Sequence, residues 1–399
     1  MSKKGSAKVE TLQLKPSEAT IAINHMIKVN LENAKLGKVR RGLFLWGGPG
    51  IAKSSLVKQI AKAMNFVVID IRLTQMEPTD LRGIPVPTDG ANGEVVVQWA
   101  IPEMLPRRAE GETTAKIVDK VTGHVYDGAI LLLDELPNAA PSVQAGSYQL
   151  VLDGQLGEYI VPDNVVVLAA GNRETDKGST FKMPTPLMNR FTHIEVRPDF
   201  EDWQNYALQV EFDKDVIGYL TAFKHELYDF DPQSASKGFA TPRSWEAVSD
   251  IKRGNPNLPE MVMLGLLSGT VGDGIAVKFM EYTKNAAQLP ASDDILDGKI
   301  KKLSNKETSL MYALTTAMCY ELRARYAELK KDPKNAEKKK WFDASADNFL
   351  GFMLENFQSE MIIMGARSAL SIYNIRMNPA AMKNWTAFAK DYQALILSA

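Results

Sequence analysis

The amino-acid sequence predicts an α/β protein in which helices sandwich a parallel sheet and a largely helical region follows. Three short, almost wholly apolar runs carry this prediction: Leu43–Trp46, Phe66–Ile71 and Ala129–Leu133. Such runs are typical of strands that a parallel sheet buries on both faces. Apolar residues with helical spacing over 17–34 and 54–64 predict one helix before and one helix after the first strand along the chain. Beyond Trp203 the pattern turns largely helical.

The composition argues against several classes of function, although local basic patches remain possible. The 47 basic and 48 acidic side chains leave a net charge of −1, so no global field attracts nucleic acid or anionic membranes. No apolar run approaches the roughly 18 residues that span a bilayer, so we expect no membrane insertion and a cytoplasmic protein. The single cysteine, Cys319, lies in an apolar helical pattern and is expected in a core. The four histidines lack metal-ligand spacing: His25, His124, His193 and His225.

A glycine-rich turn between the first strand and a helix predicts a phosphate-binding loop. The loop is formed by Gly47, Gly48, Pro49, Gly50, Ile51, Ala52, Lys53, Ser54 and Ser55. Backbone N–H groups of such a loop converge on nucleotide phosphates, with the lysine on the outer phosphates and the hydroxyl of Ser54 on Mg²⁺. Ala52 stands where the common pattern has glycine, and any positive φ there would cost free energy. The alternative is a glycine-rich hairpin beside a surface lysine.

Two carboxylates, Asp134 and Glu135, follow the strand Ala129–Leu133. Parallel sheets present ligand chemistry at the carboxyl ends of their strands. Asp134 is therefore expected to hold Mg²⁺ through its water shell, and Glu135 to activate the water that attacks the γ-phosphate. The alternative is an ordinary acidic turn, which is common after strands of α/β proteins.

A further strand, Val165–Ala170, leads into Gly171 and Asn172. A polar side chain at this strand end could lie between the first two motifs and bond both the γ-phosphate and the attacking water. Asn172 suits that position. The alternative is a plain turn asparagine, because Gly-Asn favours turns.

Two arginines lie at the ends of predicted elements. Arg190 lies where a helix end passes into a short strand, and its guanidinium could point toward a neighbouring subunit. Arg243 lies at the start of a helix for which Thr241 is the expected N-cap and Pro242 the first residue.

Five motifs in this order resemble the MoxR-type AAA+ ATPases of the dynein-related AAA subgroup: Gly-Gly-Pro-Gly-Ile-Ala-Lys-Ser, Leu-Leu-Leu-Asp-Glu-Leu, Ala-Gly-Asn-Arg, Met-Asn-Arg-Phe and Thr-Pro-Arg-Ser-Trp. Alanine is frequent in that family at the position of Ala52. The resemblance implies an N-terminal helix and AAA+ P-loop core over 1–200, an α-helical lid over 201–300 and a helical C-terminal extension over 301–399.

The resemblance also implies a role for each residue of the motifs. Lys53 and Ser54 match the Walker A pair, Asp134 and Glu135 the Walker B pair, Asn172 the first sensor, Arg190 the arginine finger given in trans, and Arg243 the second sensor, in cis or in trans. An arginine supplied across an interface implies a homo-oligomeric ring, most often of six subunits, that hydrolyses ATP with Mg²⁺.

Several functions remain open at this stage. The resemblance implies a chaperone-like ATPase that remodels or activates a protein partner, commonly one with a von Willebrand factor A domain. The segments Leu81–Trp99 and Asp153–Tyr159 would face the pore of the ring. The alternative is a nucleic-acid-dependent ring motor, such as a helicase or restriction-type NTPase, which the lysine-rich segment Lys330–Lys340 favours. The segment itself is expected to be a solvated loop between helices, with nucleic-acid contact as the alternative. A scaffold that binds ATP without turnover is a third possibility, which Glu135, Asn172 and Arg190 together argue against.

Overall fold

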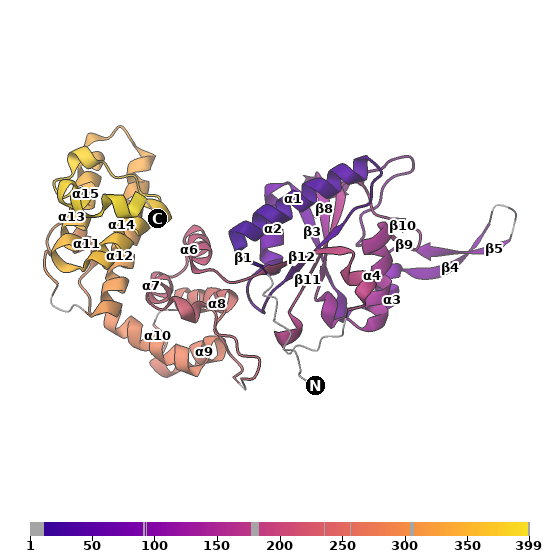
Figure 1. Cartoon of the computed structure of the whole chain (residues 1–399), viewed down its shortest axis with the longest axis horizontal. Helices are drawn as coiled ribbons and strands as arrows, with labels where there is room; N and C mark the ends of the chain where they lie inside the picture. Colours follow the sequence, from indigo (N-terminus) through magenta and orange to yellow (C-terminus); the bar gives the residue numbers. More distant parts are fainter. Residues whose placement is uncertain are drawn as a thin grey trace, which may run out of the picture. The chain divides into compact units, whose positions relative to one another are not determined.

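The computed structural model describes residues 12–90, 92, 94–176, 183–234, 236–255, 257–303 and 307–397. It divides into two units, Met1–Asp199 and Phe200–Ala399, which are described separately below (Figure 1). The expected boundary near residue 300, between a lid and an extension, stays a prediction.

The first unit is built on a six-stranded parallel sheet. Across the sheet the strands follow the order β1 (Gln13–Leu14), β12 (Phe191–Val196), β2 (Gly42–Trp46), β11 (Val165–Gly171), β8 (Gly128–Asp134) and β3 (Phe66–Arg72). Every neighbouring pair in this order is parallel. The predicted α/β fold class is therefore confirmed. β2 and β8 are buried as expected, whereas β3 lies at the edge of the sheet and is only partly buried.

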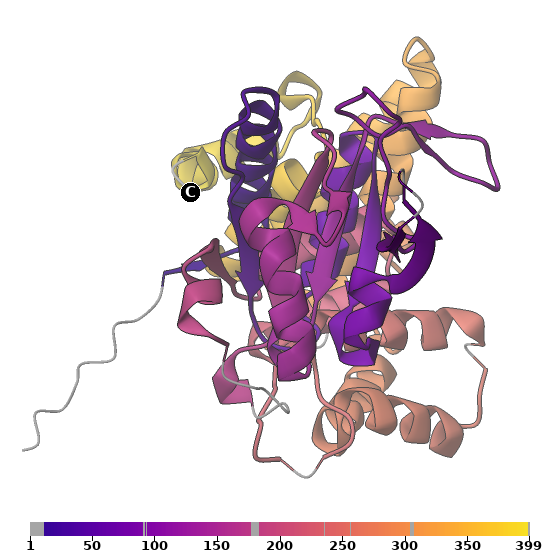
Figure 2. The same cartoon turned by 90° about the vertical axis from the view of Figure 1, so that its right-hand side faces the viewer.

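Helices cover both faces of this sheet (Figure 2). One face carries the two predicted helices, which are α1 (Pro16–Lys35) and α2 (Lys53–Ala63). The other carries α3 (Pro78–Arg82) and α4 (Pro141–Asp153). Because side chains alternate along β2, Leu43 and Leu45 pack under α1 and α2 while Phe44 packs on the opposite face.

Three short hairpins supplement the sheet. They pair β4 (Ile84–Asp89) with β5 (Val95–Ala100), β6 (Ile117–Val118) with β7 (Val125–Tyr126), and β9 (Gln155–Leu156) with β10 (Tyr159–Ile160). The β4–β5 hairpin extends away from the sheet (Figure 1) and confirms the β element expected around Val95. β1 and the β6–β7 pair were not predicted, since two-residue strands are too short to give a periodic pattern.

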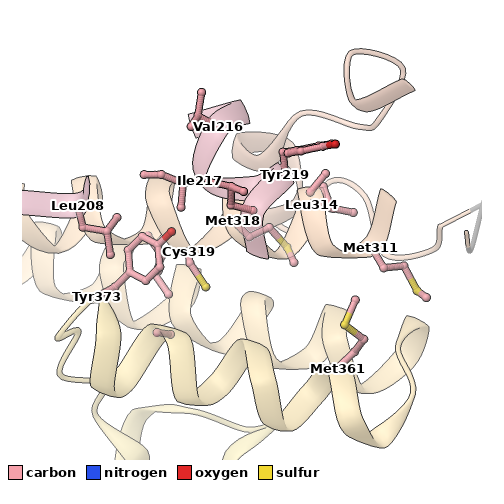
Figure 3. Close-up of a cluster of buried hydrophobic side chains, with 14 of the residues drawn as sticks. Leu208, Val216, Ile217, Tyr219, Met311, Leu314, Met318, Cys319, Met361 and Tyr373 are labelled. Atoms are coloured by element: carbon pink, nitrogen blue, oxygen red, sulfur yellow. The ribbon is translucent and has the colours of Figure 1, made fainter. Parts of the chain in front are cut away.

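The second unit is helical, as predicted. Its α-helices are α6 (Phe200–Gln209), α7 (Lys214–Ala222), α8 (Pro242–Gly254), α9 (Glu260–Val271), α10 (Asp273–Ala286), α11 (Ser292–Leu296), α12 (Thr308–Lys331), α13 (Ala336–Asn356), α14 (Ser359–Arg367) and α15 (Trp385–Leu397). One hydrophobic core joins them, and Figure 3 shows a part in which Met318 of α12 lies beside Ile217 of α7 and Met311 of α12 lies opposite Met361 of α14. Burial raises the pKa of the Cys319 thiol well above its usual range, which fits the predicted core role.

The lysine-rich segment is mostly helical, so the expectation of a loop over Lys330–Lys340 is wrong. Helix α12 continues to Lys331 and α13 begins at Ala336, which leaves a connection of only four residues. Lysine is a good helix former. Asn335 also starts α13 early, because its side chain accepts hydrogen bonds from the backbone N–H groups of Glu337 and Lys338.

Within the described parts of the chain, no helix combines the length and the apolarity needed to cross a lipid bilayer.

Candidate active site

Three strand ends bring the predicted motifs to one edge of the sheet. β11 lies between β2 and β8, and all three are parallel. The phosphate loop after β2, Asn172 after β11, and Asp134 with Glu135 at the end of β8 therefore lie side by side. Ligand sites of open α/β sheets form at this carboxyl edge.

Lys53 is the centre of this arrangement. Its side chain is buried, with 9% of the residue exposed. The ammonium donates to the carbonyl oxygens of Gly47 and Gly48, 2.9 and 3.0 Å away, and to Oδ1 of Asn172 at 2.9 Å. Lys53 thus links the loop that would hold phosphates to the side chain predicted to sense them.

Ser54 joins the loop to the acidic strand end. Its hydroxyl donates to Oδ2 of Asp134 across 2.8 Å. A hydroxyl and a carboxylate are the hard oxygen donors that Mg²⁺ prefers, and this ion usually takes one or two protein oxygens together with substrate phosphates. Among the described residues there is no cluster of three or more histidine, cysteine or carboxylate side chains that would hold a metal without such a ligand. The donor set therefore fits Mg²⁺ bound together with a nucleotide.

Two non-glycine residues of the site have left-handed backbone conformations. Ala52, the N-cap residue of α2, has φ +69°, and Glu135 has φ +58°. Such conformations cost roughly 1–2 kcal/mol for an L-residue. The cost anticipated at Ala52 is therefore present. Strained backbone is often found where a site has to hold a geometry against its local preference.

Glycines allow the close approaches around the loop. A Cβ on Gly47 would lie 2.3 Å from Cδ1 of Ile51 and 2.8 Å from the carbonyl oxygen of Val196. A Cβ on Gly171 would lie 2.5 Å from Cδ of Pro137, just beyond Glu135. Gly171 therefore lets the strand end that carries Asn172 pack against the turn that carries Glu135.

Thr74 is a site residue that sequence reasoning missed. It lies in the 3-10 helix Leu73–Gln75, directly after β3, and its hydroxyl donates to Oε2 of Glu135 across 2.7 Å. Nothing in the sequence around Thr74 marks it. Pairing of β3 with β8, in which Arg72 is opposite Asp134, is what brings the two side chains together.

Arg190 is not brought to this edge. It lies between α5 (Thr185–Met188) and β12, whose first residue, Phe191, pairs with Gly42 at the amino end of β2. The phosphate loop begins at the other end of β2, four residues or about 13 Å along the strand. The side chain of Arg190 is exposed.

Arg243 belongs to the second unit. Thr241 caps α8, accepting a hydrogen bond from the Ser244 N–H at 3.0 Å, and Pro242 is the first helical residue, as predicted. Arg243 is exposed in the first turn of this helix.

Comparison with known proteins agrees with this reading of the first unit. Residues 42–191 match the family model of the AAA domain of the dynein-related subfamily. Midasin of Giardia intestinalis is 26% identical over 206 residues, which make up 49% of this chain but only 4% of midasin. The chain therefore corresponds to a small part of that relative.

Two solved structures are similar at low identity. RuvB of Thermotoga maritima, a Holliday junction branch migration motor, is 16% identical, with a TM-score of 0.33, over 70% of this chain and 76% of its own. A putative ATPase from Cytophaga hutchinsonii is 14% identical, with a TM-score of 0.28, over 96% and 92%. Scores of this size add nothing to the fold seen in the sheet itself. The family match, in contrast, spans the three strands whose carboxyl ends meet around Lys53, so residues 42–191 form an AAA-type ATPase domain that is similar to the dynein-related subfamily.

Proposed function

We propose that this protein is a ring-forming, Mg-ATP-hydrolysing ATPase of the MoxR type, which uses ATP turnover at subunit interfaces to remodel or activate a protein partner in the cytoplasm. The observation that carries the proposal is the separation of Arg190 from Lys53 by the length of β2. An arginine at the opposite edge of the sheet is poorly placed to serve its own phosphate loop. It is well placed to serve the loop of a neighbouring copy.

Each residue of the carboxyl edge has a task in this proposal. The backbone N–H groups of residues 47–55 and the ammonium of Lys53 bind the phosphates. Ser54 and Asp134 would hold Mg²⁺, which neutralises charge on the phosphate oxygens when it is bound. Glu135 takes the proton of the attacking water, and Asn172, already bonded to Lys53, orients that water against the γ-phosphate.

Arg190 supplies charge from outside the subunit. Phosphoryl transfer accumulates negative charge on the equatorial oxygens, and a planar guanidinium binds two of them at once. Such a heterologous interface generates either a closed ring or an open filament, and we propose a closed ring of six copies. Arg243 is proposed as the second sensor, acting on its own subunit or on the next.

The partner is proposed to be a protein with a von Willebrand factor A domain. The near-neutral charge of the chain supports a protein over a polyanion. The β4–β5 hairpin also supports a protein client, because Ile84, Val95 and Val97 are 63%, 73% and 57% exposed. Exposed apolar side chains along a hairpin that extends from the sheet suit contact with a polypeptide. We propose that this hairpin and the β9–β10 hairpin face the pore.

A nucleic-acid-dependent ring motor is the second candidate. The lysines at the end of α12 and the start of α13 favour it. Two of these lysines already have partners within the chain. Lys331 forms an ion pair with Glu328, and the ammonium of Lys330 lies over the ring of Tyr326, 4.5 Å from its centroid. This arrangement supports the protein-remodelling function over the motor.

The two functions are separated by the response of the ATPase rate to nucleic acid and to salt. A motor is stimulated by double-stranded DNA or RNA and loses that stimulation as salt rises. For the protein remodeller we expect a flat response to both polymers. The Glu135→Gln protein, incubated with Mg-ATP, should sediment as a ring and bind purified von Willebrand factor A domain protein encoded by the same genome. DNA stimulation without such binding would overturn the proposal.

A further inference from the structure

Three backbone carbonyls around Arg190 accept hydrogen bonds from side chains. We call residues 188–191 the Arg190 turn. The carbonyl oxygen of Met188 lies 2.7 Å from Nε2 of His193, and those of Asn189 and Phe191 lie 3.0 and 3.2 Å from Nη2 of Arg41. The backbone is therefore held on both sides of Arg190, while the Arg190 side chain itself stays exposed.

Arg41 is itself fixed to the body of the first unit. It precedes β2 directly, and its backbone exchanges two hydrogen bonds with the side chain of Asn30 in α1, at 2.9 and 2.8 Å. Asn30 is only 2% exposed. A single guanidinium nitrogen of Arg41 then reaches two carbonyls, so this side chain connects the start of β2 to the Arg190 turn.

His193 is fixed from the other end of β2. The indole N–H of Trp46 donates to Nδ1 of His193 across 2.8 Å. Because an indole nitrogen can only donate, Nδ1 has to accept, and Nε2 carries the hydrogen that is given to Met188. Trp46 immediately precedes Gly47, the first residue of the phosphate loop.

We propose that Arg41 and His193 are positioning residues for Arg190. Their hydrogen bonds connect the Arg190 turn to the two ends of β2. The strand that leads into one subunit's phosphate loop thereby fixes the position of the arginine that contacts the next subunit's site. The inference rests on the proposed function, in which Arg190 acts in trans. An error of about 1 Å in the position of a group that binds the transition state can cost about a hundredfold in rate. Loss of either support should therefore reduce turnover at the neighbouring site.

Mixed rings can test this directly. The donor subunit carries Glu135→Gln, which silences its own site but leaves Arg190 intact. The acceptor subunit carries Arg190→Ala, which keeps its own site but offers no arginine. Each is inactive alone, so the turnover of their mixture reports an acceptor site served by a donor's Arg190. Co-purification through two different tags confirms mixed assembly.

The test adds Arg41→Met or His193→Phe to the donor only. Both variants keep the bulk of the side chain but remove its hydrogen bonds. We expect the recovered kcat to fall about tenfold or more, with the KM for ATP changed less than twofold, because the ATP-binding residues of the acceptor are untouched. Arg41→Lys, which keeps a donor at the end of the stem, should restore part of the loss.

The matched control places the same substitutions in the acceptor, which has no arginine to position. Recovery should then be unaffected, whereas a general folding defect would lower it in either placement. Equal loss in both placements, or no loss in the donor, overturns the inference and leaves the proposed function standing. If the unmodified pair forms mixed rings without any recovery, the trans role of Arg190 fails and this inference fails with it.

Discussion

The hydroxyl of Thr74 donates a hydrogen bond to Oε2 of Glu135 across 2.7 Å. Thr74 follows the edge strand β3 and Glu135 follows its neighbour β8, so the bond joins two adjacent strand ends. Glu135 also has φ +58° and its N–H donates to Oδ1 of Asp134 at 2.9 Å. Glu135, proposed to activate water, is thus held at its carboxylate by Thr74 and at its backbone by Asp134.

Removing the Thr74 hydroxyl should impair turnover more than binding. In Thr74→Val the side chain keeps its shape but cannot donate, and Glu135 loses the bond that orients its carboxylate. We expect kcat to fall about tenfold, which is less than the roughly hundredfold or more that a general base contributes, because the carboxylate itself remains; the KM for ATP should be nearly unchanged. Steady-state ATPase kinetics measure both constants. Thr74→Ser is the control and should keep most of the activity, while a Thr74→Val rate equal to that of the natural protein would show that this bond has no role.

Glu135→Gln should separate binding from hydrolysis. The amide has almost the size of the carboxylate but cannot accept the proton of the attacking water, so turnover should fall at least a hundredfold. Fluorescent ATP-analogue titration should give a dissociation constant within about threefold of the natural protein. Lys53→Ala serves as the contrasting variant, because it should lose binding as well. Substantial residual turnover in Glu135→Gln would mean that another group activates the water.

The strands and the principal motifs were predictable because their signals are local. An apolar run followed by glycine and lysine, or by two carboxylates, predicts both the strand and the functional residues that follow it. The position of Asn172 between the other motifs was also expected, and β11 does lie between β2 and β8. Local sequence is sufficient where a strand and its functional turn are contiguous.

The supports of the site were not predictable, because each depends on pairing between distant segments. Thr74 meets Glu135 only through the pairing of β3 with β8, and Arg41 meets Asn189 only through that of β2 with β12. His193 appeared in the sequence as an isolated histidine without metal-ligand spacing. Its contact with Trp46 depends on the pairing of two neighbouring strands, and no sequence pattern in either strand predicts it.

The left-handed conformation of Ala52 predicts unusual behaviour of substitutions there. Glycine removes the steric cost of φ +69° but adds entropy to the unfolded chain, so Ala52→Gly should be neutral or stabilising by up to about 1 kcal/mol. A β-branched residue is far less tolerant of this conformation, so Ala52→Val should destabilise the first unit by about 2 kcal/mol and weaken ATP binding. Thermal unfolding and nucleotide titration measure the two effects.

Ala63→Gly is the matched control for Ala52→Gly. Ala63 is an exposed residue in the last turn of the same helix, with right-handed helical backbone. Glycine there should lower the free energy of unfolding by about 0.5 kcal/mol. The two alanine-to-glycine changes should therefore differ in sign or clearly in size. An equal loss in both would indicate that Ala52 bears no conformational cost.

Arg325 should be the most sensitive polar residue of the second unit. It is 4% exposed, and its guanidinium donates to Asp293 and Asp297 at 2.8 Å and to Ser345 at 2.8 Å. Arg325→Met removes these bonds between α11, α12 and α13 and should cost about 2 kcal/mol, or about 5 °C in melting temperature. Glu328→Gln, which breaks an exposed pair with Lys331 on the same helix, should change stability by less than about 0.5 kcal/mol.

The effect of Arg325→Met should also depend on pH. The hydrogen bond from Arg325 lowers the pKa of Asp293 and that of Asp297, while burial raises the pKa of Glu321 and Arg325 opposes that rise. A carboxyl group with a lowered pKa stabilises the folded state above its unfolded pKa, near 4, and loses this contribution as the pH falls through its folded value. The difference in melting temperature between the natural protein and Arg325→Met should therefore be constant between about pH 6 and 8 and shrink below about pH 4. Calorimetry across this range measures it, and a difference that grew on acidification would contradict ion pairing as the source of the stability.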